Sequence, residues 1–154
     1  DNGFDVWIVS ASPQFVIEPV AAMVNVAPDH VIGIQYVITN GKLTQQLQSC
    51  GGIAAGFDAP ITFDTGKRCW IQQTIFHQNN DPAELLPNPD LTLRQVFTAG
   101  DSDTDIAFIK DATVLKLAIN RNKVQLMCNA YENLDDKWLI QPMFISPKAQ
   151  RSSP

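Results

Sequence analysis

The chain has 154 residues, 45% hydrophobic residues and a formal net charge of −5, which are the size and composition of one globular domain. Its 11 basic residues form no run, which excludes a domain that binds DNA or RNA mainly through the phosphate backbone, so no nucleic-acid partner is expected. No apolar stretch approaches the roughly 20 residues that span a bilayer, and no membrane partner is expected either.

The first elements that the sequence predicts are a buried strand, a helix and a hairpin. Residues 6–9 form an apolar run without alternation, typical of a strand in a parallel sheet. A helix should follow, capped by Ser12 and with Pro13 in its first turn. Residues 31–38 predict a second strand, and Asn40-Gly41 predicts a hairpin turn after it. The helix should bury an apolar stripe made of Phe15, Val16, Val20, Met23 and Val24.

The remainder of the chain continues the alternation of strands and helices. Gly66 and Lys67 open a predicted helix, residues 95–99 form a strand that leads into a short helix around 106–110, and residues 115–119 form another strand. This order predicts an α/β fold, a Rossmann-like parallel sheet flanked by helices. We expect one domain over residues 1–147 and a loose tail over residues 148–154.

Polar residues follow three of the predicted strands, where ligands of such sheets bind. Ser10 follows the first, the acidic segment 101–105 follows the strand at 95–99, and Asn120 follows the strand at 115–119. These positions predict one shared site at this edge of the sheet.

The acidic segment holds three carboxylates, Asp101, Asp103 and Asp105. Hard oxygen ligands at this density favour Mg²⁺ or Ca²⁺. An EF-hand is excluded, because the sixth position of such a loop would be Ile106 instead of Gly and the twelfth Ala112 instead of Glu. The alternative is a solvated acidic turn that caps a helix.

Two further positions could bind an anion. Lys67 could supply a fixed positive charge for a phosphate, although a Lys after a Gly can equally be a surface residue. The Ser10 hydroxyl and the neighbouring Ala11 amide could bind an anion at a helix N-terminus, or Ser10 could be an ordinary hydroxyl at a helix start.

Taken in order, these segments resemble the second, third and fourth motifs of the haloacid dehalogenase superfamily. They are the hydrophobic strand ending in Ser10, Gly66-Lys67 before a helix, and Gly100-Asp101-x-x-x-Asp105 after a strand. The resemblance covers roughly residues 4–122. Residues 6–13, 31–43 and 66–67 are most similar to the phosphoserine-phosphatase branch, and residues 138–142 to phosphorylcholine-phosphatase-like members.

The resemblance implies a Mg²⁺-dependent phosphomonoesterase that acts on a small phosphorylated metabolite, such as phosphorylcholine, through an aspartyl-phosphate. Ser10 and Ala11 would bind the transferring phosphoryl group, and Lys67 would neutralise it and hold the nucleophile. Asp101 would be a direct Mg²⁺ ligand. Asp105 would orient Lys67 or a metal-bound water.

The family's first motif, Asp-x-Asp after a buried strand, does not occur in this sequence. In the family that strand lies in the middle of the sheet and carries the nucleophile and the acid/base. We therefore expect an upstream segment of the same protein to supply the central first strand and the cap, and this chain alone to be inactive.

Two other functions stay open at this point. One is a non-catalytic phosphate- or metabolite-binding protein with a degenerate fold of the same kind. The other is a receiver-like or flavodoxin-like domain, which is disfavoured because receivers place an acidic pair after an early strand, where this chain has Ser10.

The cysteines leave the redox compartment open. Cys50, Cys69 and Cys128 lack the spacing of a zinc site, and three buried thiols or one disulfide with a spare thiol both fit. His30 and His77 have no metal-type spacing and are interpreted as packing or surface residues. The resemblance favours a bacterial periplasmic or secreted protein, with a cytoplasmic one as the alternative.

Overall fold

The computed structural model describes residues 3–56, 59–79 and 81–143. The predicted tail at 148–154 lies outside these residues. The strands are β1 (Ile8–Pro13), β2 (Val31–Ile34), β3 (Tyr36–Thr39), β4 (Lys42–Leu47), β5 (Phe97–Gly100), β6 (Leu115–Ile119) and β7 (Trp138–Gln141). The α-helices are α1 (Gln14–Ala22), α2 (Thr65–Thr74), α3 (Ile106–Ile109) and α4 (Val124–Glu132). Short 3₁₀ turns are η1 (Pro28–His30), η2 (Pro82–Leu85), η3 (Leu91–Leu93) and η4 (Asp103–Asp105).

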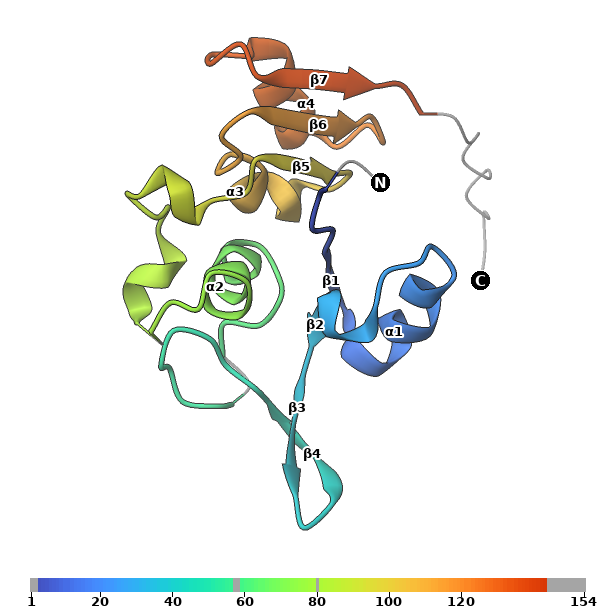
Figure 1. Cartoon of the computed structure of the whole chain (residues 1–154), viewed down its shortest axis with the longest axis vertical. Coiled ribbons are helices and arrows are strands. Elements are labelled where there is room, and N and C mark those ends of the chain that lie inside the picture. The colour runs from blue at the N-terminus through green and yellow to red at the C-terminus, as the bar shows by residue number, and fades with distance from the viewer. Residues whose placement is uncertain (1–2, 57–58, 80, 144–154) are drawn as a thin grey trace.

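The described strands form three small sheets. β1 and β2 are parallel, β5, β6 and β7 form a parallel sheet in that order, and β3 and β4 form an antiparallel hairpin. In Figure 1 the three-stranded sheet lies at one end of the molecule, the hairpin projects from the other, and α2 lies between them. The fold is therefore α/β, with parallel sheets flanked by helices. Among the described strands β1 and β5 do not pair, so the parallel strands form two separate sheets. From the sequence we expect the strand between them to come from an upstream segment.

The main hydrophobic core surrounds α2. Cys69, Trp70 and Ile71 of this helix pack with Phe108 and Ile109 of α3. Burial of these side chains removes apolar surface from water and joins the two parallel sheets through the helix. Further buried members of this core are Ile32, Cys50, Ala118, Leu126, Ala130 and Trp138. No helix in the described residues is both long and apolar enough to cross a membrane.

A buried arginine fixes α2 against its neighbours. Arg68 Nε donates to Asp111 Oδ2 at 2.5 Å, and Nη2 donates to Asp111 Oδ1 at 2.9 Å. The same guanidinium donates to the carbonyl oxygens of Ala107 at 2.5 Å and Leu85 at 3.1 Å. A planar bidentate contact of this kind sets orientation as well as distance, so the helix is held in one rotational position.

The first predicted helix is wrong in detail. β1 continues to Pro13, which pairs with Ile34 of β2, so Ser12 stays extended and caps no helix. Pro13 precedes the helix, which begins at Gln14. The prediction that the apolar stripe is buried is also wrong. The buried residue of α1 is Ala21, because its small side chain lets the helix approach β2 closely. The five residues of the stripe, Phe15, Val16, Val20, Met23 and Val24, are exposed.

The later elements agree better with prediction. The hairpin turn is confirmed, with Asn40 and Gly41 at φ values of 51° and 72°, the left-handed pair that two-residue hairpins need. The helix after Gly66 and the strand at 115–119 are confirmed as α2 and β6. The strand predicted over 31–38 is two strands, β2 and β3, which pair with different partners. The sequence did not predict α4 or β7.

Candidate functional site

A cavity of about 340 Å³ opens where β1 and β5 end. Parallel strands bring their carboxyl ends to one edge, so residues far apart in sequence meet there. All five residues predicted for the site, Ser10, Ala11, Lys67, Asp101 and Asp105, line this cavity. The other lining residues are Val9, Ser12, Ala99, Gly100, Ser102, Thr104 and Phe108.

Lys67 reaches the cavity from the first turn of α2. The preceding Gly66 allows this approach, because a Cβ at that position would lie 1.8 Å from the carbonyl oxygen of Ile61. Lys67 is only 5% exposed, and its Nζ donates to Asp105 Oδ1 at 2.5 Å. The ammonium also lies 5.9 Å from the centre of the Phe108 ring, within the range of a cation–π contact. Lys67 is therefore a buried, fixed cation and not a surface residue.

Asp105 is held on both oxygens. While Oδ1 accepts from Lys67, Oδ2 accepts from the backbone N–H groups of Asp101 and Ser102, each at 3.0 Å. Gly100 makes room for this carboxylate, since a Cβ there would lie 2.7 Å from Asp105 Cβ and 2.9 Å from Oδ2. The carboxylate thus joins the loop after β5 to the lysine of α2.

Asp101 lies at the rim of the cavity. Its side chain is 38% exposed and forms an ion pair with Arg121, which comes from the turn after β6. The hydrogen bond to the Asp101 carboxylate raises the pKa of Arg121 above its usual value. The sequence motifs did not indicate Arg121, although its position after a predicted strand could have placed it near the site.

Two polar positions have structural roles. Asp103 Oδ1 accepts from the backbone N–H of Leu126 at 2.9 Å, near the start of α4. Asn120, which the sequence placed in the shared site, does not line the cavity, and its Oδ1 accepts from Asn122 N at 3.0 Å. Both side chains accept hydrogen bonds from backbone N–H groups, which is a local structural role.

On the β1 side, polar residues of the strand itself form the cavity wall. The Ser10 hydroxyl oxygen accepts from the backbone N–H of Ser12 at 3.2 Å, and Ser12 itself lines the cavity. Because a hydroxyl that accepts one bond still has its own proton to donate, Ser10 can donate to an anion in the cavity.

The donor types fit a hard cation such as Mg²⁺. Such an ion typically uses one or two carboxylates and keeps several waters. Asp101 offers a carboxylate at the open rim, whereas both oxygens of Asp105 already accept hydrogen bonds. Asp101 could therefore hold the ion directly, and Asp105 through a water.

No protein-family model matches the chain, and no curated protein matches it. A solved structure, that of a conserved functionally unknown protein from Anaerococcus prevotii DSM 20548, is similar with a TM-score of 0.61 and 26% sequence identity. The similarity covers 90% of this chain and 33% of that chain, so this chain spans about a third of that protein's length. The comparison supports the α/β fold and assigns no activity.

Proposed function

We propose that the chain is part of a Mg²⁺-dependent phosphomonoesterase of the haloacid dehalogenase type. The observation that carries this proposal is the buried Lys67–Asp105 ion pair beside a cavity that Ser10 and Asp101 also line. Phosphoryl transfer depends mainly on positioning and on stabilising charge on the phosphoryl oxygens. A fixed cation, a hydroxyl and an exposed carboxylate at one strand-end cavity are suited to that task.

Each residue has a distinct role in this proposal. Ser10 Oγ and the Ala11 N–H donate to oxygens of the phosphoryl group, and Lys67 Nζ offsets their charge. Among the described residues, Lys67 donates one of its three N–H groups to Asp105, which leaves two for ligands. Asp105 is a positioning residue that keeps the lysine and the loop after β5 in place.

The proposed cation would be held by Asp101 directly and by Asp105 through water. When bound, Mg²⁺ supplies positive charge to the phosphoryl oxygens. For Asp101 to bind it, the carboxylate has to turn away from Arg121, which is feasible because this pair is solvent-accessible and therefore weak.

The nucleophile would come from an upstream segment that carries Asp-x-Asp on a strand. The carboxylates that line the cavity in the described residues are those of Asp101 and Asp105, and both already have roles. β1 pairs only with β2 and β5 only with β6 among the described strands, so each has an unpaired edge. A strand added between these edges would satisfy their backbone groups and place its carboxyl end at the cavity.

In the proposed reaction, the first Asp of that segment attacks phosphorus, and the ester oxygen leaves as an alcohol with a proton from the second Asp. The second Asp then takes a proton from water, which attacks the aspartyl-phosphate and releases inorganic phosphate. Ser10 and Lys67 hold the phosphoryl oxygens throughout. This chain alone would bind the phosphate ester but would not hydrolyse it.

The test is hydrolysis of p-nitrophenyl phosphate and phosphorylcholine by the protein that carries this chain together with the upstream segment. We expect Mg²⁺-dependent turnover that Lys67→Met lowers by at least about 100-fold, as removal of one charge-stabilising donor does. Lys110→Met, at an exposed lysine, is the matched control and should keep full activity. Equal activity of the Lys67 variant, or turnover without Mg²⁺, would contradict the proposal.

A non-catalytic phosphate-binding protein is the second candidate. It is favoured because both described carboxylates of the cavity are already in ion pairs, Asp105 with Lys67 and Asp101 with Arg121, so neither is placed to act as a nucleophile. Binding of inorganic phosphate with Mg²⁺ but no hydrolysis, even with the upstream segment present, would select this function. The Cys50–Cys69 disulfide supports a periplasmic or secreted location over a cytoplasmic one for either candidate.

A further inference from the structure

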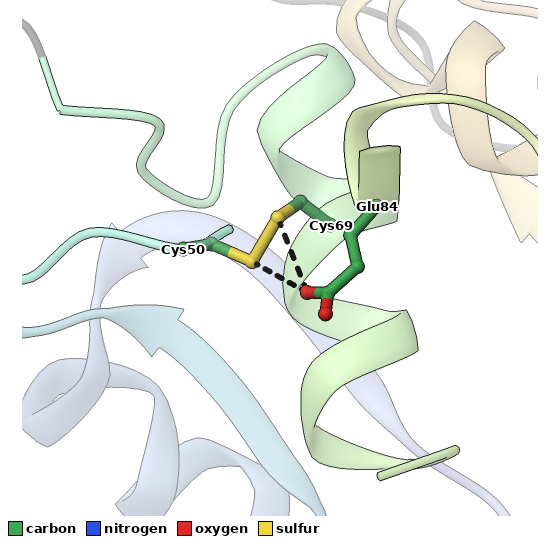
Figure 2. Close-up of side chains that lie close together, drawn as sticks. All are labelled: Cys50, Cys69 and Glu84. Carbon is green, nitrogen blue, oxygen red and sulfur yellow. Dashed lines mark hydrogen bonds between the residues drawn. A yellow bond between two sulfur atoms is a disulfide. The ribbon is translucent and has the colours of Figure 1, made fainter. Parts of the chain in front are cut away.

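Cys50, Cys69 and Glu84 form a buried cluster on the side of α2 away from the cavity. Cys69 lies two positions after Lys67, about 200° further round the helix, and it does not line the cavity. Cys50 comes from the loop after β4, and Glu84 from η2. Both cysteines are fully buried and Glu84 is 4% exposed. Figure 2 shows the three side chains converging from three segments of the chain.

The cysteines form a disulfide, and Cys128 is an exposed free thiol, so the interpretation of all three as buried thiols is wrong. Glu84 Oε2 lies 3.7 Å from Cys50 Sγ and 3.8 Å from Cys69 Sγ, the two contacts drawn in Figure 2. A disulfide sulfur carries no hydrogen and cannot donate, so these contacts are not hydrogen bonds in the oxidised protein.

Glu84 therefore has one oxygen without a donor. Its Oε1 accepts from the backbone N–H of Asp81 at 3.0 Å. In the described part of the chain, no N–H or O–H group donates to Oε2, which is aimed at the sulfur atoms. An uncompensated carboxylate oxygen in the interior is costly and suggests that another partner binds there in a different state.

We propose that, once the disulfide is reduced, Cys50, Cys69 and Glu84 bind one zinc ion. Zinc takes thiolates at about 2.3 Å and carboxylate oxygens at about 2.0–2.2 Å in a tetrahedron, which places sulfur and oxygen ligands about 3.5 Å apart. The two sulfur–oxygen distances are already close to that value. The fourth position is left for water. Thiolate sulfur selects zinc over the Mg²⁺ of the cavity.

The reaction balances with a dithiol as reductant. The dithiol transfers two electrons and two protons to the disulfide, giving two thiols and its own cyclic disulfide. Zinc binding then releases the two thiol protons to solvent. After reduction the sulfurs separate to about 3.8 Å, as zinc geometry requires. The Cα atoms of the two cysteines are 6.0 Å apart, so side-chain rotation can provide this separation.

Such a site would keep the loop after β4 tied to α2 in either redox state of the protein. In the oxidised state the disulfide joins the loop after β4 to α2. In the reduced state the zinc ion would join that loop, α2 and η2. Lys67 would then keep its place in reducing surroundings because its helix stays anchored.

The experiment is anaerobic reduction with a dithiol, removal of the reductant and titration with Co²⁺, which reports thiolate ligands by a charge-transfer band and is then displaced by Zn²⁺. We expect one equivalent to bind to the reduced protein and none to bind through sulfur to the oxidised protein. Cys128→Ser should change nothing, whereas Glu84→Gln should weaken binding by more than the 10- to 100-fold lost with an outer-shell partner.

Three results would overturn the zinc site. They are a folded, reduced protein without the thiolate band, a band that persists in Cys50→Ser, and a band that Cys128→Ser removes. If reduction unfolds the protein, circular dichroism provides the readout. Zinc then has to restore the native spectrum of the reduced chain, and failure to do so would equally overturn the proposal.

Discussion

Replacing Asp105 by Asn removes one charge from a buried ion pair while it keeps the shape of the side chain. The amide oxygen can still accept from the backbone N–H groups of Asp101 and Ser102, so the change acts on the contact with Lys67, whose ammonium then faces the amide NH₂. Loss of one partner of a buried pair costs about 3–5 kcal/mol, because the remaining charge is left uncompensated. Since the loop contacts survive, we expect about 3 kcal/mol for Asp105→Asn.

The reverse change, Lys67→Met, should cost less. The Asp105 carboxylate that remains still accepts two backbone hydrogen bonds, so the expected loss is about 1.5–3 kcal/mol, the value of a hydrogen bond to a charged group. In the double variant neither charge is buried without a partner. Its total loss should be no greater than that of Asp105→Asn alone, which gives a coupling energy of about 2 kcal/mol.

Urea unfolding followed by tryptophan fluorescence measures these free energies, with Trp70, which is buried on the same helix as Lys67, as a probe. Lys110→Met and Glu132→Gln, at exposed positions, are the matched controls and should change stability by no more than about 0.5 kcal/mol. A loss below about 1 kcal/mol for Asp105→Asn, as at a surface pair, would refute the assignment of a buried pair. Strict additivity in the double variant would do the same.

Two further predictions concern packing and pH. Gly66→Ala should destabilise the protein by about 1–3 kcal/mol or more, because the new methyl group would meet a main-chain carbonyl oxygen at 1.8 Å, and unfolding midpoints equal to wild type would contradict this. The hydrogen bond to Asp29, with the Asp5 carboxylate nearby, raises the pKa of His30 above its ordinary 6.5. The interaction of protonated His30 with these carboxylates stabilises the protein fully below about pH 6.5, and this stabilisation is lost as pH rises through the raised pKa. Asp29→Asn should lower the pKa of His30 and reduce this pH-dependent stabilisation. NMR titration of His30 and unfolding measurements between about pH 5.5 and about pH 9 test both effects.

The sequence predicted which residues meet at the cavity better than it predicted how the strands pair. Motif residues have local structural requirements. Gly66 allows a close approach of two backbone segments, Lys67 follows it in the first turn of a helix, and Asp105 caps its own turn. Such requirements can be recognised from a few neighbouring residues in the sequence. The division of residues 31–38 into β2 and β3 depends on which strands pair with each half, and pairing partners lie far away in the sequence.

The predicted role of the first helix failed for a similar reason. An apolar stripe such as Phe15, Val16 and Val20 indicates an amphipathic helix but not what covers it. In the described chain, α1 packs through Ala21 and leaves the larger side chains exposed. The pairing of Cys50 with Cys69 was equally beyond the sequence, because three cysteines allow several pairings and spacing alone does not choose among them.

The charges around the cavity connect the proposed cation with the proposed substrate. Among the described lining residues, the charged side chains are Lys67, Asp101 and Asp105, and they sum to −1. The two described cations near a phosphate dianion in this cavity, Lys67 inside it and Arg121 at the rim, are each already paired with a carboxylate. A divalent cation at Asp101 changes that sum to +1, so the cavity should favour a phosphoryl group only when the cation is present. This charge count supports the proposed dependence on Mg²⁺ by an argument separate from the resemblance that first suggested it.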